Sequence, residues 1–303
     1  MTITNITLNQ LRILTAIVEA GGFSTAAVKL GMTQSGASQA IAQLEAAVGG
    51  KLLVRSKDGV APNAIGQLVL RDAREAVRAA ERIEQNCAAA AGLLKGELRI
   101  GSVTSAATRL LPTVLAQYRR RYPEISISLL EGTDQEVVSW VESGIADIGL
   151  TSEASRDTES QLIAEDVFFL LVHHRHLLSR RRKVKLTELS QESFLMSGSG
   201  CEPAIRRLFE SSGVTPKVVL TVRDGATLQE MVAQGIGVTM MPGLSLAADD
   251  HRFCRLVTEP LGKRRVLSIV SRRKPIAPAV EKFSELLSGL KRKRTSANAV
   301  AHH

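Results

Sequence analysis

The N-terminal part of the chain carries apolar residues at helical spacing, in short blocks that glycines interrupt. The first block recurs every three or four residues, which predicts an amphipathic helix. Its apolar positions are Leu8, Leu11, Leu14, Ile17 and Val18. Gly21-Gly22 ends this helix, and Ser24 is placed to cap a short second helix over residues 25–30. The pattern therefore begins with two short helices joined by a tight glycine turn.

A third helix and a hairpin follow. Thr33 is a natural N-cap for a helix over residues 34–48, which Gly49-Gly50 ends. Its buried side is predicted to be Ala37, Ile41, Leu44 and Val48. Residues 52–61 then form a small hairpin around a glycine-containing turn. This order indicates a winged helix-turn-helix, while the spacing alone leaves open an ordinary three-helix packing unit with a solvated polar face.

The polar side of the third helix is the part of this unit suited to DNA. Residues at the start of a recognition helix enter the major groove, where Gln bonds adenine and Ser contacts a base or a phosphate. Basic residues of a wing suit the DNA backbone or the minor groove. The predicted DNA-binding residues are Thr33, Gln34, Ser35, Ser38, Gln39, Arg55 and Lys57.

A long helix follows the hairpin, from a cap at Asn63 to about residue 91. Its apolar residues form a narrow stripe of the coiled-coil type: Ile65, Val69, Ala73, Ala76, Ala80, Ile83 and Cys87. The stripe either packs against the chain's own next domain or pairs with a second copy. Pairing is the favoured interpretation, because a two-fold dimer reads two half-sites of DNA.

After residue 96 the pattern changes to strands alternating with helices, which indicates an α/β fold with a mainly parallel sheet. The first strands are predicted at 97–101, 125–130 and 146–150, with helices at 105–121 and 134–143 between them. The same alternation recurs at 167–172, 202–212, 217–222, 227–234 and 237–241, and a strand at 266–270 and a helix at 279–290 close the chain. The second half therefore contains two α/β lobes, with a ligand expected between them.

Hydroxyl groups lie at the strand ends and helix starts where a ligand between the lobes is expected. The N–H groups at a helix N-terminus favour an anion. Plain helix capping is the alternative for each hydroxyl, and the two roles do not exclude one another. The predicted effector-binding residues are Ser102, Thr104, Ser105, Thr133, Ser199 and Cys201.

Composition changes this picture little. The formal net charge is +9, which favours polyanionic partners. Most of the excess lies in four basic runs at 180–183, 263–265, 272–274 and 291–294, which we expect to be solvated loops and a basic tail. No apolar stretch is long enough to span a membrane, and the first ten residues lack the pattern of a signal peptide. These features favour a cytoplasmic, nucleoid-associated protein.

The sequence offers little catalytic or metal-binding chemistry. Cys87, Cys201 and Cys254 lie far apart, which argues against a zinc site or a disulfide framework. His173, His174 and His176 adjoin an arginine run, and we expect exposed loop histidines rather than metal ligands. We find no Gly-x-Ser-x-Gly, phosphate loop or zinc motif. We therefore expect no enzyme activity, no catalytic residue, no metal and no cofactor.

The N-terminal motifs, in their order, closely resemble the LysR-type transcriptional regulator family. The matching runs are Leu8-Asn-Gln-Leu-Arg12, Gly21-Gly-Phe-Ser-Thr-Ala-Ala27, Thr33-Gln-Ser-Gly-Ala-Ser-Gln-Ala-Ile41, Leu44-Glu45 and Leu52-Leu-Val-Arg55. The likeness extends over the whole chain, including the strand Leu98-Arg-Ile-Gly101 that opens the sensor domain of the family. Each motif is moderately specific, and the ordered set is strongly so.

The resemblance implies a multidomain fold with an all-α winged helix-turn-helix and a linker helix, followed by a two-lobed, periplasmic-binding-protein-like α/β effector domain. The expected domains are 1–62 for DNA binding, 63–92 for the dimerisation helix, 97–290 for the effector domain and 291–303 for a disordered basic tail. Lobe I covers about 97–166 and 266–290, and lobe II about 167–265.

The resemblance also implies the partners of the chain. They are double-stranded promoter DNA, a small anionic effector such as an aromatic carboxylate, and other copies of the chain in a dimer or a dimer of dimers. RNA polymerase is a further candidate partner. By likeness to members that respond to aromatic compounds, Ser105 and Thr133 match hydroxyls that hold an effector carboxylate, and Cys201 falls near a contact position of the second lobe.

The sequence departs from the family pattern at the recognition helix and the wing. The family usually has Pro where Ser35 stands and often Arg where Gln39 stands, and Pro62 occupies a normally aliphatic wing position. The predicted recognition helix carries no Lys or Arg. DNA contact then depends on polar side chains, on phosphate contacts at the helix N-terminus, on the wing and on the avidity of an oligomer.

Overall fold

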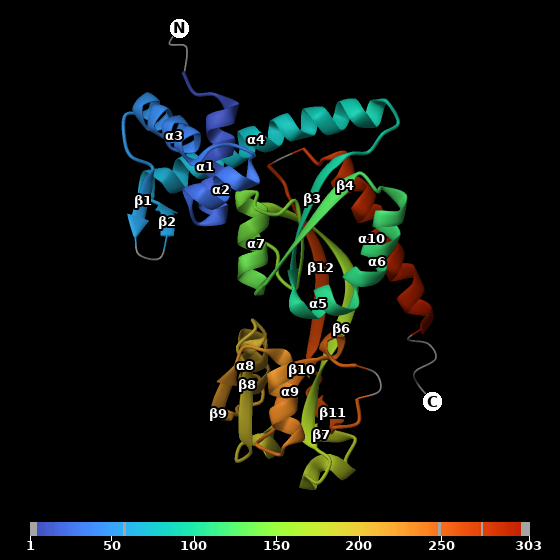
Figure 1. Cartoon of the computed structure of the whole chain (residues 1–303). Helices are drawn as coiled ribbons and strands as arrows, with labels where there is room; N and C mark the ends of the chain where they lie inside the picture. The colour runs from blue at the N-terminus through green and yellow to red at the C-terminus, as the bar shows by residue number, and fades with distance from the viewer. Residues whose placement is uncertain (1–4, 57–58, 248–249, 274, 298–303) are drawn as a thin grey trace. The chain divides into compact units, whose positions relative to one another are not determined.

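The computed structural model describes residues 5–56, 59–247, 250–273 and 275–297 (Figure 1). The chain divides into two compact units, of which the first is Met1–Gly96 with Ser143–Ile145 and the second is Glu97–Glu142 with Ala146–His303. Each unit has its own secondary structure and hydrophobic core, and each is described separately below.

The first unit is a helical bundle with a short hairpin. Its elements are α1 (Leu8–Ala20), α2 (Phe23–Lys29), α3 (Gln34–Val48), β1 (Leu53–Ser56), β2 (Gly59–Pro62) and α4 (Ala64–Ala90). Thr7 caps α1 in a capping box with Gln10, and Gly21 ends it in the left-handed conformation with φ 68°. The predicted order of helices and hairpin is confirmed.

The core of the first unit joins α1, α2 and α3 to the start of α4. Its most deeply buried members are Ile13, Leu14, Ile17, Ala26, Ala37, Leu44 and Leu52. The β1–β2 hairpin is tied to this core because the N–H of Val60 donates to the carbonyl oxygen of Gly21 at 3.0 Å. Helix α4 approaches so closely that a Cβ on Gly66 would lie 2.0 Å from the carbonyl oxygen of Leu52, so this position requires glycine.

The second unit alternates strands and helices, as the sequence predicted. Its first elements are β3 (Gly96–Val103), α5 (Thr104–Arg109), α6 (Leu111–Arg121), β4 (Ile125–Gly132), α7 (Asp134–Ser143), β5 (Ile148–Thr151) and β6 (Thr158–His173). The next are η1 (Leu177–Arg180), β7 (Lys183–Lys185), η2 (Leu186–Leu189), β8 (Ser193–Ser197), α8 (Glu202–Glu210), β9 (Lys217–Val222) and α9 (Gly225–Ala233). The last are β10 (Thr239–Pro242), η3 (Gly243–Ser245), β11 (Phe253–Glu259), β12 (Lys263–Ser271) and α10 (Pro278–Ala297).

Strand β6 connects the two lobes of the second unit. The main sheet has the order β4-β3-β5-β12-β6-β11-β7, with β10 also paired to β6. The first part of β6 pairs antiparallel with β12, and the last part pairs with β10 and β11. We name the part built on β3–β5 and the β12 side of β6 lobe I, and the part built on β7–β11 lobe II. The antiparallel pair of β6 and β12 therefore leads from one lobe into the other.

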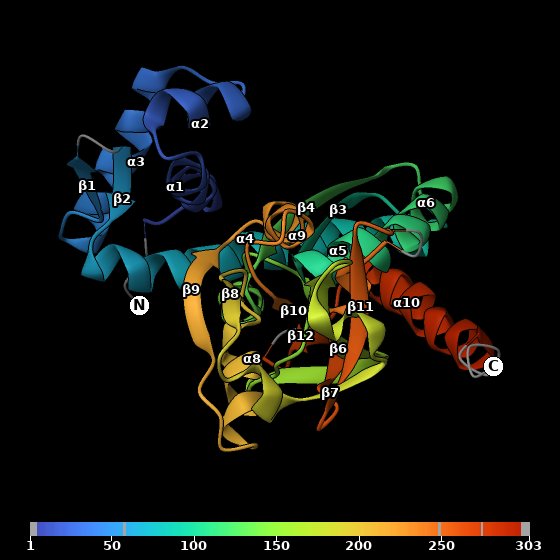
Figure 2. The ribbon, with the colours of Figure 1, turned by 90° about the horizontal axis from the view of Figure 1, so that it is seen from below.

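Helices cover both faces of the sheet in lobe I. On one face α7 packs on glycines, because a Cβ on Gly101 would lie 3.1 Å from Trp140 and one on Gly149 only 2.8 Å from Val137. On the other face α6 and α10 lie side by side, as the views in Figures 1 and 2 agree. The hydroxyl of Tyr118 in α6 donates to the carbonyl oxygen of Ala279 in α10 at 2.8 Å.

Lobe II encloses its own core. The parallel pair of β8 and β9 lies beside β10, through a bridge from Phe194 to Val238. Phe194 and Phe209 meet edge to face with ring centroids 5.2 Å apart, which is a favoured aromatic geometry. The lobe thereby has a rigid base for α8, the helix that follows the Ser197–Cys201 loop.

Five predictions of local structure need correction. Helix α2 begins at Phe23 after an N-cap at Gly22, so Ser24 lies inside the helix and does not cap it. The main sheet is mixed rather than mainly parallel, because β6 pairs antiparallel with β10, β11 and β12. The helix predicted over 105–121 is two helices, because the chain breaks at Leu110 and Pro112 begins α6 anew. The closing helix continues to Ala297 rather than ending at residue 290, since Lys and Arg are strong helix formers. The run Lys263-Arg264-Arg265 is not a solvated loop but the beginning of β12, with Arg264 buried.

Candidate functional site

The predicted recognition helix α3 turns its apolar side into the core and its polar side outward. Ala37, Ile41 and Leu44 are buried as expected, and Val48 is half-buried. The predicted DNA-binding residues Thr33, Gln34, Ser35 and Gln39 are exposed, and Ser38 is half-buried. The first turn of α3 therefore presents short polar side chains to the solvent.

The cap of α3 orders this first turn. The Oγ1 of Thr33 accepts the N–H of Gly36 at 3.1 Å and lies 3.2 Å from the Oγ of Ser35. The remaining N–H groups of the turn point out of the helix, and together with the helix dipole they favour a phosphate oxygen. Gln34 and Ser35 are exposed in this first turn, the part of a helix-turn-helix that was predicted to contact DNA.

Arg55, one of the two residues of the wing predicted to contact DNA, packs against a residue of the core. The guanidinium of Arg55 lies over the ring of Phe23, 4.7 Å from its centroid. A cation over an aromatic face is attracted to it and loses conformational freedom, so Arg55 is partly ordered in advance of any partner. Lys57, the second predicted contact of the wing, lies outside the described residues.

The buried carboxylate of Glu45 fixes the segment between α3 and the wing, and sequence reasoning assigned it no role. Its Oε1 accepts the N–H of Leu52 at 2.9 Å, and its Oε2 receives the ammonium of Lys51 at 2.7 Å. Burial opposes the ionised form, but the hydrogen bonds from Lys51 and Leu52 outweigh it and lower the pKa of Glu45. A lone acidic residue at the end of a predicted helix gives no signal of this role.

Part of the predicted stripe on α4 serves the local core and part is exposed. Ala73 is buried against α1–α3 and Val69 packs beside it. Of the predicted stripe, Ile65 and Ile83 are 57% and 65% exposed, and Cys87 is exposed. Leu68, which was not part of the predicted stripe, is 62% exposed. Eighteen residues, or five helical turns, separate Ile65 from Ile83, so both lie on one face of the helix.

A cavity lies between the lobes of the second unit. It measures about 160 Å³. The lining residues come from the start of α7, the end of β5, the start of α8 and the β6–β12 pair: Asp134, Ser152, Glu153, Phe168, Gly200, Cys201, Pro203, Ala204, Arg207, Lys263, Arg264 and Arg265. Among these described residues, basic side chains outnumber acidic ones by four to two. One of the acids, Asp134, already accepts hydrogen bonds from the hydroxyls of Thr151 and Ser152.

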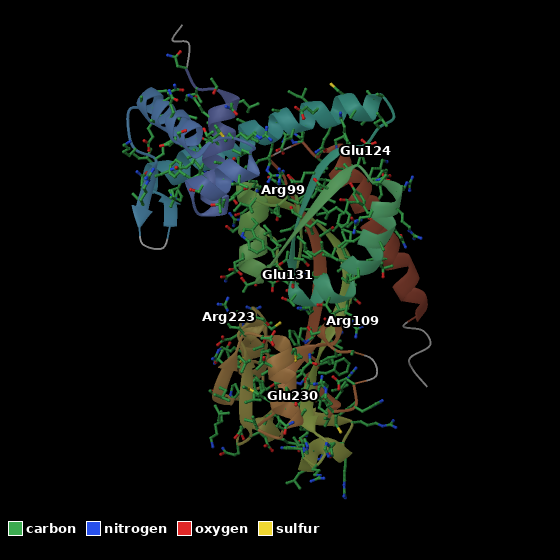
Figure 3. All side chains as sticks on the ribbon, in the orientation of Figure 1. Arg99, Arg109, Glu124, Glu131, Arg223 and Glu230 are labelled. Atoms are coloured by element: carbon green, nitrogen blue, oxygen red, sulfur yellow. The ribbon has the colours of Figure 1, made fainter. Side chains whose placement is uncertain are left out.

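The buried side chain of Arg264 ties the walls of this cavity together. Its Nη2 donates to the Oγ of Ser105 at 2.7 Å and to the Oδ2 of Asp166 at 3.1 Å, and its Nη1 lies 4.0 Å from the Sγ of Cys201. Burial raises the pKa of the Asp166 carboxyl despite the neighbouring guanidinium. Lobe I also contacts lobe II through Arg109, whose Nη2 donates to the carbonyl oxygen of Leu246 (Figure 3).

The predicted effector-binding hydroxyls are distributed unevenly around the cavity. Ser105 reaches it indirectly, through Arg264. Thr133 caps α7 with Glu136, because the N–H of Glu136 donates to the Oγ1 of Thr133 at 3.3 Å and the N–H of Thr133 donates to the carboxylate of Glu136 at 2.8 Å. Thr133 also lies behind Gly200, which lines the cavity, because a Cβ placed on Gly200 would be 3.1 Å from the Cβ of Thr133.

The other predicted effector residues differ in their surroundings. Ser102 is fully buried and donates to the carbonyl oxygen of Val103, and Thr104 is exposed. The hydroxyls of Ser199 and Ser197 are 2.8 Å apart. Cys201 lines the cavity directly, and burial raises the pKa of its thiol. Arg264, which joins Ser105 to Cys201, was not among the predicted residues.

The histidine cluster is held by ordinary contacts. The Nε2 of His176 lies 3.2 Å from a carboxylate oxygen of Glu192, and the rings of His173 and His174 are tilted by 44° with centroids 3.9 Å apart. Among the described residues, no group of three or more His, Cys, Asp or Glu side chains is placed to hold a metal ion. Within the same part of the chain no single helix is long and apolar enough to cross a membrane; α1 and α2 pass that test only as a pair, bent by 118°.

The helix-turn-helix and the two-lobed α/β unit define the chain as a protein of the DNA-binding regulator class. The model of the LysR-family bacterial regulatory helix-turn-helix protein matches residues 8–67, and that of the LysR substrate binding domain matches residues 91–291. The second match covers more than half of the chain. The chain therefore belongs to the LysR-type transcriptional regulators, a family of regulators rather than enzymes.

Relatives of known sequence and structure agree with this assignment. The probable transcriptional regulator LrrA of Synechococcus elongatus is 34% identical over 78% of this chain and 81% of its own. The uncharacterised regulator YvbU of Bacillus subtilis is 28% identical over 80% of this chain and 83% of its own. The crystal structure of the LysR family regulator CbnR is 25% identical, covers 94% of this chain and 99% of its own, and superposes with a TM-score of 0.67. The predicted fold class and family are confirmed.

Proposed function

We propose that the chain recognises promoter DNA through α3 and the wing, in pairs of subunits, and that a small anionic effector in the interlobe cavity controls this binding. The contacts assigned to DNA are Thr33, Gln34, Ser35, Ser38, Gln39, Arg55 and Lys57. CbnR has been crystallised with its target DNA, which supports the DNA-binding half of the proposal. Such a protein acts in the cytoplasm, at the nucleoid.

The observation that carries the effector half is the charge of the cavity wall. Four basic residues line it against two acidic ones, and one of those acids is already engaged in hydrogen bonds. A small cavity with a net positive lining favours an anion. The cavity volume is similar to that of an engineered cavity of about 150 Å³ that accommodates benzene, so a benzoate-sized carboxylate fits. The effector is therefore a small anion.

The pairing of subunits rests on the exposed apolar face of α4. Ile65, Leu68 and Ile83 leave this face open to solvent in the single chain. Pairing with a second α4 removes these side chains from water, at about 25 cal/mol for each Å² of apolar surface buried. A dimer also presents two recognition helices to two half-sites, which raises affinity through avidity.

Control of DNA binding follows from the position of the cavity. An anion that binds residues of both lobes stabilises the arrangement in which those residues converge. Changed packing of effector domains then alters the separation of the DNA-binding pairs within the assembly. The coupling is reciprocal, so DNA that favours one arrangement also changes effector affinity.

The test begins with genomic DNA bound by the purified chain, because genes beside the bound fragments indicate the effector. Gln34→Ala is expected to relax base preference more than it changes the dependence of affinity on salt. Ser105→Ala is expected to weaken the response to the effector and to leave DNA binding without effector intact. A monomeric chain that prefers no promoter fragment over random duplex would contradict the proposal.

A further inference from the structure

The guanidinium of Arg264 is buried but has too few hydrogen-bond partners. Arg264 on β12 stands directly opposite Asp166 on β6 in the antiparallel register, and it is only 8% exposed. An arginine has five N–H donors in a fixed, planar fork. In the described part of the chain its donors meet Ser105, Asp166 and, at a long distance, the sulfur of Cys201, and its Nε–H has no partner. A buried donor without an acceptor is costly, so this side chain is poised for a further ligand.

Asp166 does not satisfy the fork by itself. Only one contact joins the two groups, from Nη2 to Oδ2 at 3.1 Å. The carboxylate also accepts the N–H of Val167 at 2.9 Å and the N–H of Leu244 at 3.2 Å, so its charge is shared with the backbone. The pair is therefore monodentate, whereas an arginine fork binds a carboxylate best through two parallel hydrogen bonds.

The guanidinium of an arginine can bind a carboxylate bidentately along two of its edges, and both of these edges include Nη2. One edge is Nε with Nη2 and the other is Nη1 with Nη2. The Nη2 atom is also the one that now contacts Ser105 and Asp166. A carboxylate that enters the cavity must therefore exchange with these internal partners.

We propose that Arg264 is the residue that selects the effector, by binding its carboxylate group bidentately, and that Asp166 is an internal competitor which occupies the same guanidinium when the cavity is empty. This inference rests on the proposed function and names the chemical group that the site recognises. Displaced from Nη2, the hydroxyl of Ser105 becomes a donor to the same carboxylate. Phe168, Pro203 and Ala204 then pack against the apolar part of the ligand.

The exchange links ligand binding to the junction of the lobes. Asp166 accepts the N–H of Leu244 in η3, and η3 is followed by Leu246, which receives Arg109 of lobe I. Arg264 and Asp166 lie on the two strands that lead from one lobe into the other. A ligand that takes Arg264 away from Asp166 therefore changes contacts at the point where the lobes join.

The test uses the full-length chain with benzoate and acetate as probes and chloride at equal ionic strength as the reference. Binding is measured by calorimetry, and by the shift of thermal unfolding followed through the fluorescence of Trp140, the single tryptophan. Asp166→Asn removes the competing charge and keeps the shape of the side chain. We expect it to bind the better probe about tenfold more tightly than the unchanged chain.

Two arginine variants distinguish binding by the planar guanidinium of Arg264 from a general attraction between the anion and positive charge. Arg264→Lys keeps the positive charge but loses the planar fork, and we expect about tenfold weaker binding of the probe. Arg265→Gln removes a whole charge from the same cavity wall, and we expect it to weaken binding less than Arg264→Lys does, because the charge of Arg265 is exposed and screened. If Arg264→Lys fails to fold, the gain expected for Asp166→Asn still decides the question.

Three results would overturn the inference. The first is that Asp166→Asn binds the probe with the same affinity as the unchanged chain. The second is that Arg265→Gln and Arg264→Lys lose the same amount of affinity. The third is that neither carboxylate shows saturable binding to the unchanged chain or to Asp166→Asn. None of them concerns DNA. If the chain still selected promoter DNA and still responded to some other molecule, the proposed function would stand and only this inference would be wrong.

Discussion

Removal of the Glu45 carboxylate tests how the recognition helix holds the wing. The carboxylate is the acceptor for the buried N–H of Leu52, the residue that leads into β1. Glu45→Ala leaves this donor without a partner, which costs about 1–3 kcal/mol. The ion pair with Lys51 adds little, because the lysine side chain is 78% exposed and surface pairs contribute about 0–1 kcal/mol.

The structure therefore predicts a graded series of variants. Glu45→Ala is expected to lower the free energy of unfolding of the first unit by about 2 kcal/mol. Glu45→Gln keeps an acceptor for Leu52 and loses only the charge, so it is expected to cost less than about 1 kcal/mol, similar to Lys51→Ala. Urea unfolding of the full chain, followed by circular dichroism, measures the loss in the helical first unit. Amide hydrogen exchange at Leu52 locates it.

The pH dependence of stability gives an independent check. The folded-state pKa of Glu45 lies below its ordinary value of 4.5. A carboxyl with a depressed pKa contributes stability that is complete above the unfolded pKa and is lost as the pH falls through the folded one. The stabilities of the unchanged chain and Glu45→Gln should therefore differ at neutral pH and converge below pH 4.5. If Lys51→Ala proved as damaging as Glu45→Ala, the backbone acceptor would not be the main contribution and this reasoning would fail.

Three further outcomes follow from other contacts. Gly66→Ala should destabilise the first unit by about 3 kcal/mol, measured by urea unfolding, because its Cβ would meet the carbonyl oxygen of Leu52 at 2.0 Å; a neutral effect would contradict the close approach. Cys201 should react with a thiol reagent slowly in the folded chain and rapidly in urea, because burial raises the pKa of its thiol; mass spectrometry of the labelled chain measures both rates, and equal rates would contradict its burial. Ile83→Glu should shift sedimentation toward smaller species, and unchanged assembly would remove this face of α4 from the interface.

The first unit could be predicted closely because its signals are local. Caps at Thr33 and Asn63 and the stop at Gly21 determine where helices begin and end, and all three act within a few residues of the chain. The tertiary contacts of this unit were less visible. The need for glycine at position 66 depends on a carbonyl group fourteen residues earlier in the chain, which no periodic pattern records.

The strands of the second unit that were missed are those whose partners are distant in sequence. The first part of β6, Thr158–Asp166, is mostly polar and showed no strand pattern of its own. It is extended because β12, about one hundred residues later, pairs with it from Ser271 to Arg264. Strand β8 is a short apolar run that periodicity alone does not separate from a loop or a buried helix. Strand β11 mixes apolar residues with Arg255 and Glu259, so it shows no clear pattern of its own.

The cavity shows how one residue can be misjudged when a charged run is treated as a whole. Lys263, Arg264 and Arg265 were expected to be solvated together, yet only the middle one is buried. The burial of β12 does not alternate clearly, because Val266, Leu267, Ser268 and Ile269 are all buried and the pairing with β6 shifts register between Val266 and Leu267. The pairing of Arg264 with Asp166 on β6, which is distant in sequence, shows which of the three charges lies inward. An arginine that falls on the inward side must then find an acceptor or a ligand, and the monodentate contact with Asp166 leaves room for both.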